Sequence, residues 1–327
     1  MRAPFIKLKI QTMTSALDVV TFGEAMLLLM ADQPGPLEDI NTFHKRTAGA
    51  ETNVAIGLAR LGLKVGWSSR LGTDIMGRYL LKAMSAEGID CSRVALDPSH
   101  PTGFMFKGRV SDGSDPAVQY HRRGSAASHM AASDIDVNWV LSARHLHATG
   151  VFAGVSAATL DLVRQSMALM RTGGRSISFD PNLRPSLWAT PKLMRDTVNE
   201  LAALADWVLP GLEEGRLLTG EQSAPAIARF YRRLGASVVV VKLGAEGAYY
   251  DSETAGSGHV PAYPVAEVVD TVGAGDGFAA GVISALLEGL TLHQAVQRGA
   301  WTGACAIQVQ GDSEGLPTRE QLVQAGL

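Results

Sequence analysis

The 327-residue sequence has few cysteines, no excess of either charge and no long apolar run. Its two cysteines, Cys91 and Cys305, lie far apart without metal-ligand spacing, so neither a disulfide framework nor a zinc site is indicated and a reducing cytoplasm fits best. The net charge of −3 offers no basic field for a nucleic acid or an anionic membrane, so we expect small-molecule partners. The longest uncharged apolar run, residues 25–31, is much shorter than the roughly 20 residues that cross a bilayer.

The length and composition are those of a folded globular protein. Hydrophobic residues make up 46% of the chain and charged residues 19%, which does not fit a disordered or fibrous chain. A chain of this length can bury a large core in one domain or in two. Residues 1–16 lack a long apolar stretch with a cleavage site, so we expect a flexible N-terminal tail ahead of one compact domain over residues 17–327.

Segments typical of strands and helices alternate along the chain. Strands are predicted at 18–30, 64–72, 145–150, 175–180, 207–209 and 237–243. Helices are predicted at 52–62, 74–88, 157–172, 191–205, 224–234, 279–290 and 296–308. This alternation predicts an α/β protein with a mostly parallel sheet that is covered by helices on both faces.

The pattern changes between residues 102 and 120. Phe104 and Phe106 on one side of a turn at 111–116, and Tyr120 on the other, lie in alternating segments that indicate a hairpin. A small β-element beside a doubly wound sheet is typical of a lid that closes an active site and excludes water. We therefore predict one compact domain with a lid.

The most informative stretch is a glycine-rich turn that opens an apolar helix, Asp270-Thr-Val-Gly-Ala-Gly-Asp-Gly-Phe278. Glycines let backbone N–H groups point into one concavity, and a helix N-terminus adds partial positive charge. Gly273, Ala274 and Gly275 are therefore predicted to form a catalytic anion hole around a phosphate group. Asp276, in the first helical turn, is the candidate base that accepts a proton from an attacking hydroxyl. The alternative is an ordinary tight turn with Asp276 as a helix cap.

This string, together with Gly49-Ala-Glu-Thr-Asn-Val-Ala55, resembles the two signature regions of the ribokinase-like (PfkB) carbohydrate kinases. The resemblance extends from about residue 18 to about residue 317. It implies a Rossmann-like (ribokinase-like) α/β fold with a small β-sheet lid built from segments near 24–48 and 100–125. It also implies a sugar site under the lid, ATP beside the 273–276 loop and Asp276 as the catalytic base. The Walker lysine motif of P-loop NTPases is absent.

Two more segments, 119–128 and 180–188, are similar to those of family members that phosphorylate 2-keto-3-deoxygluconate. A sugar acid needs a cation for its carboxylate, and Arg122 and Arg184 are the candidates because a guanidinium fork matches a carboxylate. Each arginine has the alternative role of a surface ion-pair partner. The substrate-binding residues that the resemblance implies are Gly49, Ala50, Asn53, Phe104, Tyr120, Arg122, Asn182, Arg184 and Asp276.

The sequence departs from the family pattern at His121, which replaces a second tyrosine, and at Gly211, which replaces the asparagine of an N-x-x-E motif. Glu214 keeps the acidic position of that motif and is expected to hold Mg²⁺ mainly through water, because magnesium gives up its hydration reluctantly. A simple helix start is the alternative for Glu214. The resemblance also implies a monovalent cation, K⁺, held by Asp270 and the Val272 carbonyl. The ATP-binding residues that it implies are Lys242, Gly244, Gly247, Gly273, Gly275, Ala300, Gly303 and Ala304.

These features together predict an ATP-dependent sugar kinase that phosphorylates the terminal hydroxyl of 2-keto-3-deoxygluconate. A kinase for a neutral sugar such as fructose or ribose is one alternative, and a non-catalytic sensor of a nucleotide or sugar is another. The intact Asp276 and its glycines argue against a sensor. The lack of G-x-G-x-x-G after the first strand argues against a dinucleotide-dependent oxidoreductase. The resemblance also suggests a homo-oligomer formed through the lid.

Overall fold

The main sheet of the molecule is built from strands that run mostly parallel. The computed structural model describes residues 17–110 and 116–327, and in this part of the chain the sheet has nine strands in the order β13-β12-β11-β10-β9-β8-β1-β4-β5. The pairs from β5 to β11 are parallel, and β11-β12-β13 are antiparallel. The strands are β1 (Leu17–Phe22), β4 (Val65–Gly72), β5 (Asp90–Asp97), β8 (Ala143–Thr149), β9 (Ser176–Asp180), β10 (Trp207–Val208), β11 (Val238–Lys242), β12 (Ala248–Ser252) and β13 (Gly256–Val260).

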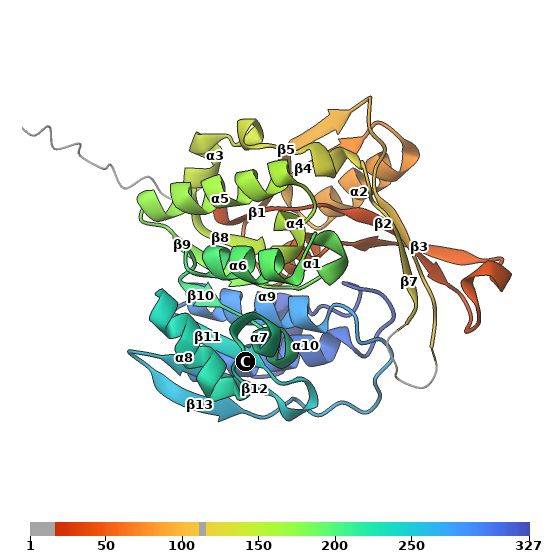
Figure 1. The fold of residues 1–327 in the computed structure, drawn as a ribbon. Helices are drawn as coiled ribbons and strands as arrows, with labels where there is room; N and C mark the ends of the chain where they lie inside the picture. The colour runs from red at the N-terminus through yellow and green to blue at the C-terminus, as the bar shows by residue number, and fades with distance from the viewer. Residues whose placement is uncertain (1–16, 111–115) are drawn as a thin grey trace, which may run out of the picture.

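Helices cover this sheet on both faces, and each face has its own hydrophobic core (Figure 1). Alternation along β11 explains the two cores, because Val239 and Val241 face one of them and Val240 faces the other. The first core includes α3 (Val137–Leu141), α5 (Ala157–Thr172), α6 (Pro191–Ala202), α7 (Leu212–Thr219) and α8 (Ala224–Leu234). The second core includes α1 (Ala50–Arg60), α2 (Ile75–Ala86), α9 (Ala274–Leu287) and α10 (Leu292–Ala306). The short helices α4 (Gly150–Ala153) and α11 (Arg319–Gln324) complete the fold.

A second, smaller sheet stands beside the main one, and we call it the lid. Within the described residues it has four strands in the order β3-β2-β6-β7, which stand at the right of the view in Figure 1. Its strands are β2 (Met26–Ala31), β3 (Phe43–Ala48), β6 (Phe104–Lys107) and β7 (Val118–His121). The β2–β6 pair is parallel, whereas β2–β3 and β6–β7 are antiparallel. These strands lie in the segments near 24–48 and 100–125 that the sequence indicated for the lid.

Most predicted elements are present in the structure, and the α/β class with helices on both sheet faces is confirmed. The single strand expected at 18–30 was wrong, because this stretch forms β1 in the main sheet and β2 in the lid, and residues 23–25 connect the two strands. The strands β5, β12 and β13 were not predicted as separate elements. The tail expected at residues 1–16 lies outside the described residues. Among the described helices, none has the length and apolar character that crossing a bilayer requires.

Candidate active site

The glycine-rich turn forms the start of α9, as its sequence predicts. Gly273 is the N-cap residue and has a φ of +84°, in the left-handed region that favours glycine. A Cβ atom at this position would overlap the main-chain carbonyl of Asp312. The turn is therefore packed directly against the 311–316 segment, and residues 273–275 present the first N–H groups of the helix to the space in front of it.

Asp276 lies in the first turn of α9 and faces a cavity rather than the sealed interior. Its Oδ2 accepts a hydrogen bond of 2.8 Å from the Asn53 side-chain amide, and its Oδ1 accepts one of 3.2 Å from that of Asn182. Burial is the main reason that the pKa of Asp276 rises from 3.8 to about 7. A carboxyl group with this pKa is suited to accept a proton near neutral pH.

The amide pair around Asp276 leaves acceptor atoms available. Asn53 Oδ1 and Asn182 Oδ1 are buried and have no hydrogen-bond partner among the described residues. Asn182 has a φ of +38°, the one positive value for a non-glycine residue in the described part of the chain. Strained backbone of this kind is concentrated at functional sites, where the surrounding structure holds it in place.

A cavity of about 430 Å³ lies in front of Asp276, between the lid and the ends of the main-sheet strands. Lid residues Met26, Met105 and Tyr120 line one side of it. Of the residues predicted for the substrate and the anion hole, those that line this cavity are Gly49, Ala50, Asn53, Tyr120, Arg122, Asn182, Arg184, Gly273, Gly275 and Asp276. The structure thus brings together segments that are far apart in the sequence.

The prediction that Phe104 contacts the substrate needs correction. Side chains alternate along β6, so Met105 faces the cavity while Phe104 lies on the opposite face of the lid. Phe104 stacks there on His121, with ring centroids 4.6 Å apart. The same alternation along β7 directs Tyr120 to the cavity and His121 away from it. The departure from the family pattern at His121 therefore lies outside the cavity.

The two arginines that were proposed for a carboxylate differ in their environment. Arg122 forms an ion pair with the buried Glu24, with distances of 2.7 Å from Nε and 2.5 Å from one terminal nitrogen. Arg184 donates to the Leu183 carbonyl at 2.9 Å and has no carboxylate within ion-pair distance in the described residues. Its positive charge is therefore less compensated than that of Arg122. Both also border an adjacent cavity of about 720 Å³.

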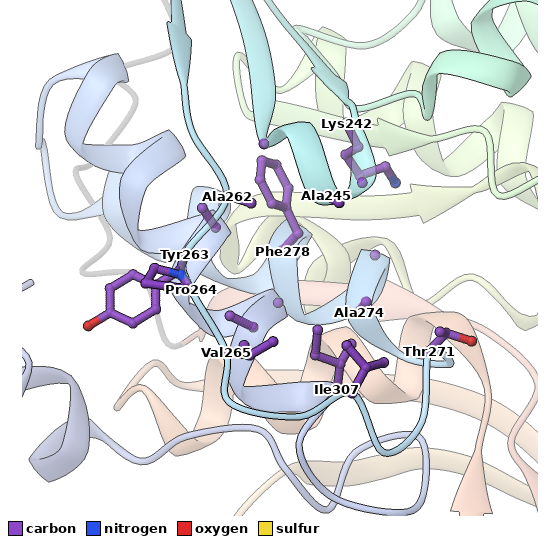
Figure 2. A pocket seen from close by; sticks show the side chains of 17 residues that line it. Lys242, Ala245, Ala262, Tyr263, Pro264, Val265, Thr271, Ala274, Phe278 and Ile307 are labelled. Carbon is purple, nitrogen blue, oxygen red and sulfur yellow. The ribbon is translucent and has the colours of Figure 1, made fainter. Parts of the chain in front are cut away.

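A neighbouring cavity of about 630 Å³ lies on the other side of the start of α9 (Figure 2). Its walls are mostly apolar, with Val265, Phe278 and Ile307 among the side chains. The predicted ATP-binding residues that line it are Lys242, Gly244, Gly247, Gly275, Ala300, Gly303 and Ala304. Ala274 lines it as well, whereas Gly273 lines the other cavity. Mostly apolar walls next to a helix N-terminus suit a nucleotide base and its phosphates.

Lys242, Thr271 and Gly275 border both cavities and form a wall that the cavities share. The ammonium group of Lys242 lies 2.5 Å from Asp180 Oδ2, and Asp180 is buried. Although burial favours the neutral amine, the nearby carboxylates of Asp180 and Glu214 raise the pKa of Lys242, which keeps it charged. A positive charge is thus held at the point where the cavities meet.

Glu214 is fixed at the start of α7, near the same point. Its carboxylate accepts hydrogen bonds of 2.7 Å from the main-chain N–H groups of Gly211 and Leu183. The main chain of Gly211 thus contacts Glu214 directly, although the family's asparagine side chain is missing there. Glu214 also lines the 430 Å³ cavity, and its carboxylate oxygens are the kind of ligand that Mg²⁺ prefers, so the residues fit a hydrated magnesium ion.

Asp270, which was predicted to hold a monovalent cation, already has a cationic partner. The side-chain ammonium of Lys107 lies 2.6 Å from Asp270 Oδ2 and 2.9 Å from Asp312 Oδ1. The main-chain N–H groups of Val272 and Gly311 donate to the same Asp270 carboxylate at 3.1 Å. Among the described residues, no cluster of three or more histidine, cysteine or acidic side chains has the arrangement of a metal site.

Comparison with known proteins agrees with this geometry. The sequence profile of the pfkB family carbohydrate kinases matches residues 16–319. The chain belongs to the pfkB family of carbohydrate kinases. The kinase is 49% identical to a 2-dehydro-3-deoxygluconokinase from Bacillus subtilis strain 168, over 94% of each chain. It is an enzyme of this family rather than a binding protein that only shares the fold.

Solved structures of related proteins have the same fold as this chain. A PfkB protein from Polaromonas sp. JS666 is 68% identical to this kinase, with a TM-score of 0.87 over 94% of this chain and 99% of the other. An E. coli protein assigned as a ribokinase II, solved with ATP and Mg²⁺, is 28% identical, with a TM-score of 0.87 over 94% and 98% of the two chains. Kinases of this family therefore bind ATP with Mg²⁺.

Several residues of the site were missed by the sequence analysis. Glu24 is buried, pairs with Arg122 and accepts a hydrogen bond of 2.5 Å from the Ser125 hydroxyl. Glu51 is buried within the first signature segment, accepts a hydrogen bond from Thr149 and has a pKa raised to about 7, mainly by burial. An acidic residue in the middle of the largely apolar stretch 18–30 was the signal for Glu24. Lys107 shares the inward face of β6 with Met105, so a lysine at an inward-facing position of a mostly apolar strand was a similar signal.

Proposed function

We propose that this kinase transfers the γ-phosphoryl group of ATP to the terminal hydroxyl of 2-keto-3-deoxygluconate in the cytoplasm. The observation that carries this proposal is the position of Asp276, between the start of α9 on one side and a cavity that holds two arginines on the other. The name of the 49% identical B. subtilis relative, 2-dehydro-3-deoxygluconokinase, denotes the same sugar acid and supports the choice of substrate.

The residues around Asp276 suggest how the reaction proceeds. The sugar hydroxyl donates its proton to Asp276, whose carboxylate is oriented by the amides of Asn53 and Asn182. The N–H groups of residues 273–275 and the Lys242 ammonium stabilise the charge on the phosphoryl group as it moves between the cavities. Glu214 is the proposed residue that would hold Mg²⁺ through water, and the ion, bound together with ATP, would neutralise further phosphate charge.

Arg184 is the proposed anchor for the substrate carboxylate. It carries a charge that no described carboxylate pairs with, whereas Glu24 already neutralises Arg122. A bidentate Arg–carboxylate contact is a strong, directional interaction, so the charge of Arg184 should favour a sugar acid over a neutral sugar. Arg122 would add a second contact through N–H groups that Glu24 does not use.

A panel of acceptors tests the proposal directly. ADP release is measured with 2-keto-3-deoxygluconate, gluconate, fructose and ribose, and kcat/KM is expected to be highest for the first. Arg184→Gln should raise the KM for the sugar acid about 100-fold with a smaller change in kcat, because a charge-assisted pair is lost, and Arg122→Gln should raise it less. Arg164→Gln, on the exposed face of α5, is the matched control. A higher kcat/KM for fructose or ribose, unaffected by Arg184→Gln, would identify a neutral-sugar kinase instead.

We also propose a homodimer in which two lids pack together. The lid face turned away from the cavity carries an aromatic cluster, in which the rings of Phe43, Phe104, Phe106 and His121 contact one another. These side chains are only partly buried or exposed in one chain, and a second lid of the same kind would cover them. Light scattering should give twice the monomer mass, and Phe106→Asp should give the monomer mass. A wild-type monomer at micromolar concentration would contradict the dimer.

A further inference from the structure

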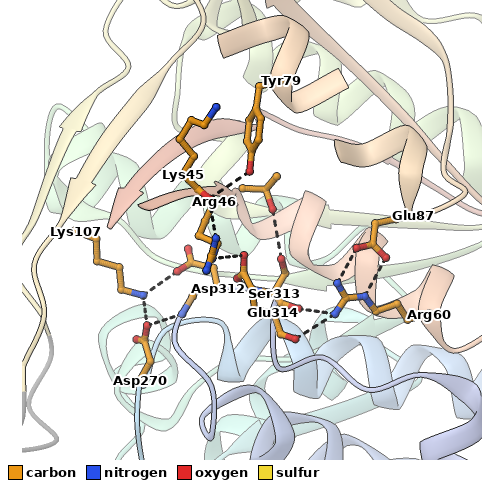
Figure 3. Close-up of polar contacts among 12 residues, drawn as sticks. Lys45, Arg46, Arg60, Tyr79, Glu87, Lys107, Asp270, Asp312, Ser313 and Glu314 are labelled. Atoms are coloured by element: carbon orange, nitrogen blue, oxygen red, sulfur yellow. Dashed lines mark hydrogen bonds and ion pairs between the residues drawn. The ribbon is translucent and has the colours of Figure 1, made fainter. Parts of the chain in front are cut away.

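Lys107 is a buried cation that connects the lid to the phosphate-binding turn. It is the last residue of β6, and its side chain is 1% exposed. Figure 3 shows its ammonium group between the carboxylates of Asp270 and Asp312. It lies 2.6 Å from Asp270 Oδ2 and 2.9 Å from Asp312 Oδ1. Burying an unpaired ammonium would be strongly unfavourable, so this side chain depends on both carboxylates.

The two carboxylates belong to the segments that shape the anion hole. Asp270 accepts from the Val272 N–H, one residue before the N-cap Gly273. The main chain of Asp312 lies against Gly273 itself, and its side chain borders the 430 Å³ cavity. Any displacement of either carboxylate would therefore shift the main-chain N–H groups that face the transferred phosphoryl group.

The segment that carries Asp312 is held firmly from its other side. Arg60 donates to the main-chain carbonyls of Ser313 and Leu316 at 2.8 and 3.0 Å, and Arg46 forms an ion pair of 3.2 Å with Glu314 (Figure 3). Arg60 is in turn paired with Glu87. With this segment fixed, the pair of Asp270 and Asp312 forms a preformed negative site that requires positive charge between its carboxylates.

Lys107 already supplies that charge. Without a cation, the two carboxylates would repel each other across a short distance in a poorly solvated place. Although burial favours the neutral amine, Asp312 and Asp270 raise the pKa of Lys107, so it stays protonated. A diffusible monovalent cation at Asp270 would have to displace this ammonium or lie beside it against charge repulsion.

We propose that Lys107 is a positioning residue that replaces a monovalent cation behind the anion hole, so that this kinase needs no K⁺ for activity. The inference rests on the proposed kinase function, because turnover is its readout. It differs from the K⁺ site that sequence resemblance implied at Asp270 and Val272. It also ties the lid to catalysis, because the ammonium comes from a lid strand.

The first test uses the wild-type enzyme with its best acceptor from the panel. Rates are measured in tetramethylammonium chloride and then with Na⁺, K⁺ or NH₄⁺ at constant ionic strength, and ADP is quantified by chromatography so that no coupling enzyme responds to the salt. We expect rates that agree to within about twofold, because a second cation beside Lys107 is repelled. Larger activation by K⁺ or NH₄⁺ would overturn the proposal. A wild-type enzyme that phosphorylates no acceptor would count against the proposed function instead.

The second test removes the ammonium. Lys107→Ala should lower kcat about 100-fold through a displaced anion hole, with smaller changes in KM, and NH₄⁺, methylammonium or K⁺ should restore activity about tenfold. Lys45→Ala, which changes an exposed lysine on lid strand β3, is the matched control and should behave like the wild type. A role in folding alone would not produce activation by added cations.

Thermal unfolding of each variant accompanies the rate measurements. A folded Lys107→Ala enzyme that keeps the wild-type kcat, or that no cation or amine activates, would overturn the proposal. Should Lys107→Ala fail to fold, Lys107→Arg takes its place, because it keeps the positive charge. Cation-independent activity of Lys107→Arg supports the proposal, and activation of that variant by K⁺ contradicts it.

Discussion

Replacing Asp276 with asparagine should abolish most turnover and, at the same time, stabilise the protein. The variant keeps the size of the side chain but cannot accept the proton of the sugar hydroxyl. Loss of a general base lowers kcat by about 10²–10⁴-fold, which corresponds to about 3–5 kcal/mol of activation free energy. The main-chain anion hole and the arginines are unchanged, so the KM values for ATP and the sugar should change little.

The stability gain follows from the pKa of Asp276. In the unfolded chain this carboxyl group loses its proton near its ordinary pKa of 3.8, but in the folded protein only near pH 7, mainly because it is buried. Its contribution to stability therefore decreases as the pH rises across that window, by on the order of 4 kcal/mol in total. An asparagine has no such dependence, so the stability advantage of Asp276→Asn should grow by about 3 kcal/mol between pH 5 and pH 8.

Two measurements on the same preparations check this reasoning. ADP release gives kcat, and urea unfolding at pH 5 and pH 8 gives the free energy of unfolding. Asp161→Asn, on the exposed face of α5, is the control for a lost carboxylate and should match the wild type in both. If Asp276→Asn turns over within tenfold of the wild type, Asp276 is not the base. If its stability advantage does not grow with pH, burial does not raise the pKa of Asp276 in the folded protein.

Three further predictions concern the same region. The kcat/KM of the wild type should fall below about pH 7 as Asp276 becomes protonated. Asn53→Leu should move this decrease to higher pH, because it removes the 2.8 Å hydrogen-bond donor to the carboxylate. A decrease at the same pH as in the wild type would argue against the contact. Gly273→Ala should lower kcat about 100-fold because its Cβ overlaps the Asp312 carbonyl, whereas Gly62→Ala, with a φ of +93° but open space around it, should lose only about 1 kcal/mol of stability and keep its activity. Lys242→Met should lose about 3 kcal/mol of stability, because it leaves the Asp180 carboxylate buried without its cationic partner. The double variant with Asp180→Asn should regain stability in urea unfolding but should not regain the wild-type KM for ATP. A restored KM would refute a phosphate contact for Lys242.

Local patterns in the sequence were enough to predict most of the fold. Helical spacing and caps predicted α5 and α8 with the bounds that the structure has, because these helices are defined by their own side chains. The glycine-rich string predicted the start of α9 because positive φ and close packing allow little but glycine at residue 273. The alternation of strands and helices predicted the parallel sheet.

Contacts between distant segments could not be predicted in the same way. Glu24 and Arg122 are 98 residues apart, and Lys107 and Asp270 are 163 apart, so no local pattern pairs them. The stretch 18–30 is largely apolar on both sides of residues 23–25, and its change from one sheet to another there depends on where β6 lies. The sequence also could not show that Met105 rather than Phe104 faces the cavity, because the direction of alternation in β6 is set by packing against the body of the protein.

The wall shared by the two cavities has a practical consequence for inhibition. Because Lys242, Thr271 and Gly275 touch both spaces, one molecule could carry adenosine at one end, a sugar acid at the other and a short phosphate chain between them. Such a bisubstrate compound would lose its freedom of motion once rather than twice on binding, and its two halves would reinforce each other. Varying the length of the phosphate bridge would then measure how far donor and acceptor lie from each other in solution.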